Sequence, residues 1–517
     1  MAAFSARDLR DLAPDEQPRK PDGPQLTLQR AQEGARRAAL AEALAGQTPR
    51  KAYSPIVLSG VVRIVDFLLL TLSGFLVFHL YIRQPMGVEY VVAVFGVVAL
   101  AMFAFQALDI NRVGVFRDPL YQGFRIVGGW SLVFLLALGA VFFLKLDGAY
   151  SRVWLLAWWA TGLALLIAER LVLSVIVRAL TASGRLDRRT VVVGGGPAGE
   201  QLLRDLAAQK HSDIRICGVF DDRTDERAPD VIAGFPKLGT VEDLVEFARH
   251  TRIDLVIFAL PITAEQRLLH MLRKLWVLPI DIRLAAHTNK LRFRPRSYSW
   301  IGNVPVLDVF DKPIADWDVV LKTAFDKIVG AVALLLLSPI MMAVALAIKL
   351  DSPGPVLFRQ KRYGFNNELI EVFKFRSMYV DKLDNTASKL VTRDDPRVTR
   401  VGRIIRKTSL DELPQLFNVV FKGNLSLVGP RPHAVHARAA DHLYDEVVDG
   451  YFARHRVRPG LTGWAQIHGW RGETDTEEKI QRRVEHDLFY IENWSLMLDV
   501  YILAMTPVAL LKAENAY

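Results

Sequence analysis

Four long apolar stretches follow one another along the first part of the chain, near residues 56–82, 88–108, 124–144 and 153–177. A helix needs about 20 mostly apolar residues to cross the hydrocarbon core of a bilayer. Each stretch reaches that length, so the pattern predicts a bundle of four transmembrane helices within residues 54–180. The polar residues 1–53 before the bundle are expected to form a disordered cytoplasmic tail.

Lys and Arg are unevenly distributed between these stretches. The tail, the second loop and the segment after the fourth stretch carry most of them, namely Arg36, Arg37, Arg50, Lys51, Arg112, Arg117, Arg125, Arg178, Arg185, Arg188 and Arg189. The first and third loops hold only Arg83, Lys145 and Arg152. Because basic loops stay on the cytoplasmic side, everything after residue 178 is expected in the cytoplasm.

Charged residues also occur inside two of the stretches. Arg63 and Asp66 lie one helical turn apart in the first, and Glu169 adjoins Arg170 in the fourth. Charges at membrane depth are costly and often functional. We favour the simpler interpretation that they form ion pairs, which hold the helices together.

The pattern changes to that of a soluble α/β domain over residues 186–310. Glu200–Lys210 predicts an amphipathic helix, and short β-branched segments predict strands at 190–193, 216–220, 254–260 and 280–284. A strand, a turn, a helix and a second strand in this order indicate a parallel, Rossmann-like sheet.

A glycine-rich turn joins the first of these strands to the helix. Gly194, Gly196 and Gly199 match the G-x-G-x-x-G spacing of dinucleotide-binding turns, and Asp221 or Asp222 falls near the position that contacts a ribose. A single motif of this kind is a weak signal. We therefore favour a structural or regulatory domain and keep nucleotide binding as the alternative.

A fifth apolar stretch, Ile328–Ile348, decides the topology. A full crossing would place the rest of the chain outside the cell, where nucleotide substrates are absent. Ser338 and Pro339 interrupt the stretch near its middle. Proline removes a backbone donor and clashes with the preceding turn, and the serine hydroxyl can satisfy a freed backbone group. We predict a re-entrant helix-break-helix, with a kinked full span as the alternative.

The last apolar stretch, Leu496–Leu511, is short and contains Pro507. It is expected to be an interfacial or core helix and not a crossing.

Composition narrows the class of protein. Apolar residues make up 51% of the chain, and 65 Lys and Arg outnumber 55 Asp and Glu, which gives a net charge of +10. Such a surplus suits anionic lipid headgroups, phosphorylated substrates or nucleic acids. The single cysteine, Cys217, excludes an internal disulfide and gives no sign of an oxidising compartment.

Basic residues are concentrated between Arg359 and Lys407. This segment holds thirteen Lys and Arg against six Asp and Glu, a surplus of seven. Arginine forks match pairs of phosphate oxygens, and anionic lipids attract the same charges beside a membrane. We expect both kinds of contact.

Two adjacent acids, Asp411 and Glu412, follow this segment. Nearby arginines keep a carboxylate ionised and therefore nucleophilic or metal-binding. The ordinary alternative is a solvated acid pair at the start of a helix capped by Ser409. Further on, Arg431 lies between two prolines, which would hold its guanidinium at low entropic cost.

Residues 316–517 contain a series of short motifs in a fixed order. They are Ser352–Val356, Arg359–Gly364, Lys374–Met378, Thr408–Gln415, Gly429–Pro432, Pro459–Gly463, Arg471–Thr474 and Arg483–Asp487. This series resembles that of the bacterial sugar transferase family, the monotopic phosphoglycosyl transferases. Together with the membrane stretches and the α/β domain, the chain resembles the large branch, the undecaprenyl-phosphate glucose or galactose phosphotransferases.

The resemblance implies a membrane protein of the α plus α/β class. Its parts would be a four-helix transmembrane bundle, a Rossmann-like α/β domain, and a re-entrant helix with a small α/β catalytic domain over residues 316–517. It also implies the bacterial inner membrane, with the catalytic domain on the cytoplasmic face. The implied reaction transfers hexose-1-phosphate from a UDP-sugar to undecaprenyl phosphate and releases UMP, as the first step of exopolysaccharide, capsule or O-antigen repeat-unit synthesis.

The same resemblance implies roles for single residues. Asp411 is expected to attack the β-phosphate of the UDP-sugar, and Glu412 is expected to bind Mg²⁺. Phosphate oxygens are expected to contact four basic side chains, Lys374, Arg376, Arg406 and Arg431. Asp487 is expected to be a further metal ligand or a structural acid.

Two other functions stay open. A membrane-anchored NAD-dependent sugar-nucleotide dehydratase or epimerase would carry a Tyr-x-x-x-Lys pair, and no tyrosine here has a lysine four positions on. A non-enzymatic scaffold of polysaccharide assembly is the second alternative. The sequence does not identify the sugar, with glucose our first expectation and galactose our second. We expect no nucleic-acid partner, and a homodimer is an open option.

Overall fold

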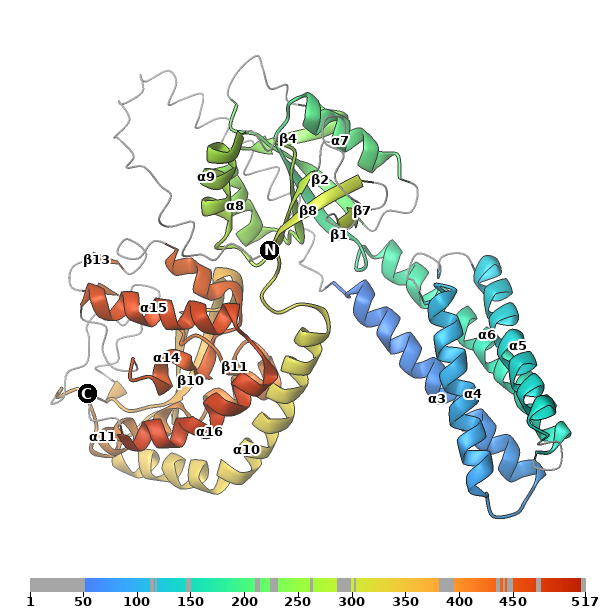
Figure 1. Cartoon of the computed structure of the whole chain (residues 1–517). Coiled ribbons are helices and arrows are strands. Elements are labelled where there is room, and N and C mark those ends of the chain that lie inside the picture. Colours follow the sequence, from blue (N-terminus) through green and yellow to red (C-terminus); the bar gives the residue numbers. More distant parts are fainter. Residues whose placement is uncertain are drawn as a thin grey trace. The chain divides into compact units, whose positions relative to one another are not determined.

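The structure of the chain is a computed structural model (Figure 1). It describes residues 52–111, 116, 119–145, 150–209, 214–223, 231–260, 264–285, 299–301, 304–380, 395–433, 438–439, 442–443, 450–470 and 476–512. The chain divides into two compact units, residues 50–188 and the residues from 189 onwards. The predicted disordered tail, 1–53, lies almost entirely outside the described residues.

Four helices make up the first unit, α3 (Pro55–Tyr81), α4 (Val88–Ala107), α5 (Pro119–Phe143) and α6 (Arg152–Ala182). All four predicted stretches are therefore helical. Among the described residues, α3, α4, Gln122–Phe143 of α5 and the later helix α10 (Asp316–Asp351) are long and apolar enough to cross a membrane. A crossing by α6, which carries Glu169 and Arg170, stays a prediction.

Tryptophans dominate the core of this bundle. Trp130, Trp154 and Trp158 are fully buried, and the last two are stacked with ring centroids 5.2 Å apart. A Cβ added at Gly74 would lie 2.7 Å from the Trp158 ring, and one at Gly162 would lie 2.8 Å from the Trp130 ring. These glycines therefore let α3, α5 and α6 approach one another closely.

An ion pair joins the first helix of the bundle to the last. An Arg170 nitrogen on α6 lies 2.7 Å from Asp66 on α3 and 3.1 Å from the Asn111 side-chain oxygen. Glu169 contacts the same guanidinium. Arg63, nearer to Asp66 in sequence, is exposed. The interpretation of these charges as contacts that hold the helices together agrees with this arrangement.

The second unit begins with an eight-stranded sheet of order β3-β4-β2-β1-β5-β6-β8-β7. The strands are β1 (Arg188–Val193), β2 (Ile214–Phe220), β3 (Val231–Ile232), β4 (Phe235–Gly239), β5 (Leu255–Phe258), β6 (Asp281–Ala285), β7 (Ser299–Ile301) and β8 (Val304–Phe310). All four predicted strands are present. β4 pairs in parallel with β2, and β5 pairs in parallel with β1 and β6.

The edges of this sheet depart from the predicted parallel pattern. β3 pairs with β4, β6 with β8, and β8 with β7 in antiparallel fashion. Between β3 and β4 the chain has only Ala233 and Gly234, both with positive φ, which is the geometry of a two-residue hairpin turn. Such a turn can only join antiparallel strands, so the sheet is mixed.

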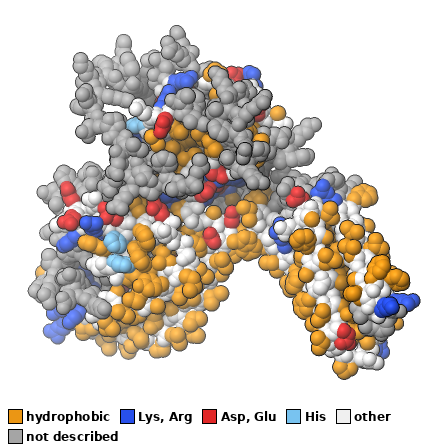
Figure 2. Space-filling model, viewed as in Figure 1, with side chains coloured by type: hydrophobic (Ala, Val, Ile, Leu, Met, Phe, Trp, Pro, Cys, Tyr) orange, Lys and Arg blue, Asp and Glu red, His pale blue; other side chains and the backbone are white. Residues whose placement is uncertain are grey.

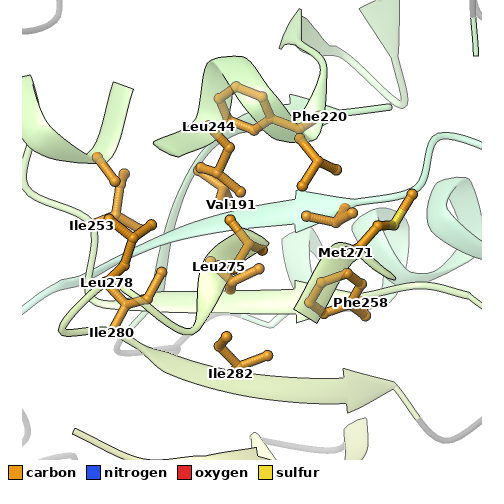
Figure 3. Packing of buried hydrophobic residues seen from close by; sticks show 14 of the residues in the cluster. Val191, Phe220, Leu244, Ile253, Phe258, Met271, Leu275, Leu278, Ile280 and Ile282 are labelled. Atoms are coloured by element: carbon orange, nitrogen blue, oxygen red, sulfur yellow. The ribbon is translucent and has the colours of Figure 1, made fainter. Parts of the chain in front are cut away.

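Helices cover both faces of the sheet. α8 (Val241–His250) and α9 (Glu265–Leu275) pack on one face, and α7 (Pro197–Ala207) packs on the other. Successive strand residues point to opposite faces: Val191 lies in the core beneath α8 and α9, and Val192 lies in the core beneath α7. Figure 3 shows the first of these two cores.

The remaining elements form a smaller α/β domain built on α10. They are β9 (Leu357–Tyr363), η4 (Phe365–Asn367), β10 (Leu369–Phe375), α11 (Arg400–Lys407), η6 (Leu410–Glu412), α12 (Gln415–Phe417), η7 (Asn418–Lys422), β11 (Ser426–Val428), β12 (Arg438–Ala439), β13 (His442–Leu443), η8 (Tyr451–Arg456), β14 (Gly460–Thr462), α14 (Trp464–Ile467), α15 (Glu477–Glu492) and α16 (Leu496–Lys512). One core joins α10 to β10, η7, β11, α15 and α16.

α10 is a single helix of 36 residues that bends part-way along its length (Figure 1). Pro339 has no N–H to donate to the carbonyl of Leu335, four residues earlier. The Ser338 hydroxyl donates to that carbonyl instead, at 2.8 Å. The predicted satisfaction of a freed backbone group by Ser338 is confirmed. The predicted break is wrong, because the backbone stays helical through Pro339 as far as Asp351.

The second half of α10 exposes a row of large apolar side chains, Leu335, Leu336, Ile340, Met342, Leu346 and Leu350. α16 exposes Met497 and Leu511 and buries Ile502. Figure 2 shows hydrophobic side chains gathered over this part of the domain. An apolar surface of this kind is typical of contact with lipid or with another protein.

Replacing Pro339 by Ala should straighten α10, because alanine restores the missing backbone donor and removes the ring clash. Two spin labels, at the exposed positions Val320 and Leu350 of a Cys217→Ser background, should lie farther apart in the Pro339→Ala variant. Pulsed EPR measures this distance.

The matched control is Ser338→Ala, which keeps the proline. It should keep the inter-label distance and lower the free energy of unfolding by about 1 kcal/mol, since one hydrogen bond is lost. An unchanged distance in Pro339→Ala would mean that packing, and not the proline, bends the helix.

Candidate active site

Asp411 and Glu412 lie on the single turn η6, directly after α11. Ser409 joins the two elements with a φ of 60°, a left-handed conformation that is costly for any residue except glycine. The Ser409 side chain does not cap η6. Both acids are partly buried. The ordinary alternative, a solvated pair at a serine-capped helix start, therefore does not describe this turn.

Glu412 is held by two cations from distant segments. Lys374 Nζ lies 2.9 Å from Oε1, and the Arg431 guanidinium reaches Oε1 at 2.5 Å and Oε2 at 3.2 Å. The two arginine contacts form a bidentate pair. Burial favours a higher pKa for Glu412, but Arg431 and Lys374 outweigh it and hold the pKa well below its ordinary range. Glu412 is therefore ionised.

Asp411 has a different character from its neighbour. Burial raises the pKa of the Asp411 carboxyl to about 6. The positive charge of Lys374 lowers this pKa, and the negative charge of Glu412 raises it further. Arg406 and Arg431 also attract its charge. Two adjacent carboxyl groups whose pKa values are pushed apart indicate two different tasks. Glu412 binds cations, and Asp411 is a carboxylate that can attack an electrophile.

The strand that carries Lys374 is fixed by Asn418, a fully buried residue at the start of η7. Its side chain accepts a hydrogen bond from Phe373 N at 3.0 Å and donates one to Glu371 O at 2.6 Å. These bonds hold β10 directly before Lys374. Sequence patterns do not reveal Asn418, because a side-chain contact to backbone 45 residues away leaves no local pattern.

The backbone around Arg431 is held by basic side chains from three elements. Lys322 on α10 donates to Val428 O at 3.0 Å, and Arg454 on η8 donates to Arg431 O at 2.8 Å. Arg362 on β9 donates to the following carbonyl at 3.1 Å. These contacts fix the path of the loop and therefore the direction of the Arg431 guanidinium toward Glu412.

Arg454 is itself buried and held by further side chains. Asp487 on α15 accepts from its guanidinium at 2.5 Å, and His433 and Tyr451 contact its other terminal nitrogen. Burial and the neighbouring arginines lower the pKa of His433 well below its ordinary value. The imidazole is therefore neutral and can lie against a guanidinium. This position makes Asp487 a structural acid.

The remaining two predicted phosphate contacts lie in different places. Arg376 is 1% exposed and donates to Pro353 O at 2.5 Å and to Ser352 O at 2.7 Å, so it fixes the turn that follows α10. Arg406 lies close enough to Asp411 to lower its pKa. The structure thus brings Lys374, Arg431 and Arg406 together around the acids, while the guanidinium of Arg376 is engaged elsewhere.

The comparisons with known proteins agree with this site. Residues 317–513 match the family model described as bacterial sugar transferase. The chain belongs to the bacterial sugar transferase family.

Three relatives show how far this likeness extends. An undecaprenyl-phosphate glucose phosphotransferase of Komagataeibacter xylinus is 42% identical over 70% of this chain and 66% of its own length, just under two thirds. UDP-glucose:undecaprenyl-phosphate glucose-1-phosphate transferases of Xanthomonas campestris and Escherichia coli are 33% and 37% identical. They are matched over 88% and 74% of this chain and over 94% and 80% of their own lengths.

A second family model, a CoA-binding domain, matches residues 106–286 of this sugar transferase. Its range includes the predicted nucleotide turn of Gly194, Gly196 and Gly199. In the structure, Gly195 N donates to an Asp221 carboxylate oxygen at 2.8 Å. The acid therefore occupies a backbone donor that a pyrophosphate would need. The turn does not fit a pyrophosphate in this conformation.

The described residues of the sugar transferase contain no group of three or more His, Cys, Asp or Glu that could hold a metal ion. Mg²⁺ usually keeps several waters and takes its other ligands from one or two carboxylates and from substrate phosphates. Both oxygens of Glu412 already accept hydrogen bonds, Oε1 from Lys374 and Arg431 and Oε2 from Arg431, so Oε2 keeps a lone pair for an ion. Glu412 therefore fits as a single protein ligand of an ion that is held mainly by a bound diphosphate.

Replacing Arg454 by Met should destabilise the sugar transferase strongly, because Asp487 would be left buried without its partner. Breaking a buried ion pair in this way costs about 3–5 kcal/mol. The double change Arg454→Met with Asp487→Leu should recover part of that loss. Thermal unfolding in detergent measures both.

The matched control is Arg456→Met on the same turn, which loses a 3.3 Å contact to Asp311 O. It should lower the unfolding midpoint much less than Arg454→Met. Equal losses in the two single variants would argue against a special role for the Arg454–Asp487 pair.

Proposed function

We propose that this sugar transferase moves hexose-1-phosphate from a UDP-sugar to undecaprenyl phosphate and releases UMP. The product is undecaprenyl-diphosphate-sugar, the start of a repeat unit of exopolysaccharide, capsule or O-antigen. The names of the relatives favour glucose as the sugar, with galactose as the second choice. One observation carries the proposal, namely the pairing of a fully charged Glu412 with Lys374 and Arg431 beside an Asp411 of raised pKa.

In the first step, a carboxylate oxygen of Asp411 attacks the β-phosphorus of the UDP-sugar. A bond forms between this oxygen and phosphorus, and the bond from phosphorus to the oxygen that bridges the two phosphates breaks. UMP leaves with the electron pair. The sugar phosphate is now bound to Asp411 as an acyl phosphate, and covalent catalysis of this kind splits one difficult transfer into two easier ones.

In the second step, a phosphate oxygen of undecaprenyl phosphate attacks the same phosphorus. The bond to Asp411 breaks, and the carboxylate is regenerated without any net change in the enzyme. Lys374, Arg406 and Arg431 surround the acids with positive charge, which stabilises the additional negative charge of each transition state. Bound Mg²⁺, with Glu412 as its protein ligand, would neutralise diphosphate charge.

The fold suits substrates that meet at a membrane surface. The apolar second half of α10 and the exposed side chains of α16 would lie in the bilayer, beside the domain that carries Asp411. We propose that α10 enters and leaves the inner membrane on the cytoplasmic side, with its bend in the bilayer. The catalytic domain then stays in the cytoplasm, where UDP-sugars are found.

The two alternative functions have less support. Membership of the sugar transferase family, with matches to relatives over most of the chain, favours phosphosugar transfer over NAD-dependent dehydration or epimerisation. A scaffold without activity has no need for the arrangement of opposed pKa values at Asp411 and Glu412.

Replacing Asp411 by Asn tests the proposal directly. Membranes with the wild-type protein, a panel of UDP-sugars and undecaprenyl phosphate should release UMP, and the variant should release none. With UDP-glucose labelled in the β-phosphate and no acceptor, the wild-type protein should become labelled and the variant should not. The matched control is Glu371→Gln, a half-exposed acid of the same domain, which should keep its activity. Transfer by Asp411→Asn would refute the nucleophile.

The pH dependence of the reaction should report the Asp411 carboxyl. The attacking group must be ionised, and its pKa is raised to about 6. Activity should therefore be fully present above that value and be lost as the pH falls through about 6. Arg431→Gln removes a charge that favours the ionised form, so the residual activity should decline at a higher pH than in the wild-type protein. Profiles of UMP release against pH check both shifts, and a profile unchanged by Arg431→Gln would contradict the assignment.

A further inference from the structure

α11 has two opposite faces with different surroundings. Val401 and Ile405 point into the apolar core shared with α10. The opposite face exposes Arg400, Arg403, Ile404 and Lys407, which are spaced as i, i+3, i+4 and i+7 and therefore lie along one side of the helix. We call this set the α11 basic face. It is distinct from Arg406, which acts on Asp411.

The first turn of α11 lies beside the C-terminal end of α10. Val401 N donates to the Asp351 carboxylate at 3.1 Å, so the first turn of α11 is tied to the last residue of α10. Ile405 packs in the same core as Ile348. On its outer side this end of α10 exposes Leu346 and Leu350, which are 62% and 79% exposed. The exposed cations of α11 and the exposed leucines of α10 thus belong to two helices that are in direct contact.

Two acids that the structure describes near α11 are engaged elsewhere. Asp351 accepts the Val401 N–H, and Asp395 is paired with Arg397 at 2.6 Å, where hydrogen bonds to Arg397 lower the pKa of Asp395 to about 2. Ile404 is 63% exposed among the three cations. A short helix with an apolar residue surrounded by Lys and Arg, beside an apolar surface, is the arrangement of helices that lie at a membrane interface.

We propose that the α11 basic face binds the headgroups of anionic phospholipids, with Ile404 entering the boundary of the acyl chains. Charge complementarity favours anionic headgroups over zwitterionic ones. Basic residues between Arg359 and Lys407 then have two roles. Arg406 acts on Asp411, and the α11 basic face binds the membrane. η6 follows α11 directly, so lipid bound here also sets the depth of Asp411. The lipid contact does not depend on the proposed reaction.

The test uses the full-length protein in nanodiscs of phosphatidylcholine that contain phosphatidylglycerol. A fluorophore is attached at Ile404→Cys in a Cys217→Ser background, and quenching by headgroup-spin-labelled phosphatidylglycerol is compared with quenching by the matching phosphatidylcholine. Phosphatidylglycerol should quench more strongly at equal content. In the variant with Arg400→Gln, Arg403→Gln and Lys407→Gln, the ratio of the two should fall toward one, by up to about fivefold for each charge removed.

Two controls separate charge from folding and from general lipid contact. Arg400→Lys with Arg403→Lys should keep the quenching ratio, because headgroup attraction needs charge and not the geometry of a guanidinium. A fluorophore at Met497→Cys on α16, which is 75% exposed, should be quenched about equally by both lipids.

Three results would overturn the proposal. They are a fluorophore at position 404 that neither lipid quenches, equal quenching by both lipids in the wild-type background, and a ratio that survives the triple change. A triple variant that raises the KM for the UDP-sugar while keeping the ratio would assign the α11 basic face to the soluble substrate instead. Because quenching needs no turnover, an inactive enzyme would not affect the outcome.

Discussion

The bidentate pair between Arg431 and Glu412 is the contact on which the candidate site depends. It joins the loop after β11 to η6, and Lys374 adds β10 to the same carboxylate. Removing one partner of such a pair leaves the other charge buried, which costs more than the pair contributes. Lys374 and Arg431 contact Glu412 directly. Burial is therefore the largest influence on the Asp411 carboxyl, and it raises the pKa of this group to about 6. Glu412 therefore positions the cations, and the Asp411 carboxylate stays available to react.

This arrangement needs support, because a guanidinium on a loop can point in many directions. Here the carbonyl of Arg431 is held by Arg454, and Arg454 is held in turn by Asp487. Lys322 connects the carbonyl of Val428 to a second buried acid, Asp499. The long basic side chains thus have two roles in this domain. Some face the acids of the site, and others fix the backbone that presents them.

Sequence patterns predicted the parts of this structure that depend on local chemistry. The four apolar helices, the central strands and the serine that replaces the bond lost at Pro339 follow from periodicity and from backbone donors. The motifs also placed Lys374, Arg431 and Arg406 near the acids. Asn418 and Arg454 were missed, and Arg376 was expected beside phosphate, because their contacts join residues far apart in sequence. From the sequence alone, an arginine that donates to buried carbonyls looks the same as an arginine that binds phosphate.

The bend in α10 shows why the distinction between a break and a kink matters physically. A broken helix at membrane depth would leave several backbone groups without partners, and each would cost several kcal/mol in hydrocarbon. A continuous helix leaves only the carbonyl opposite the proline, and the Ser338 hydroxyl satisfies it. The chain can therefore change direction in an apolar medium at the cost of a single hydrogen bond, which one side chain replaces. If α10 does return to the side it entered, Ser338 and Pro339 act as one unit, in which the ring supplies the bend and the hydroxyl keeps the bend compatible with lipid.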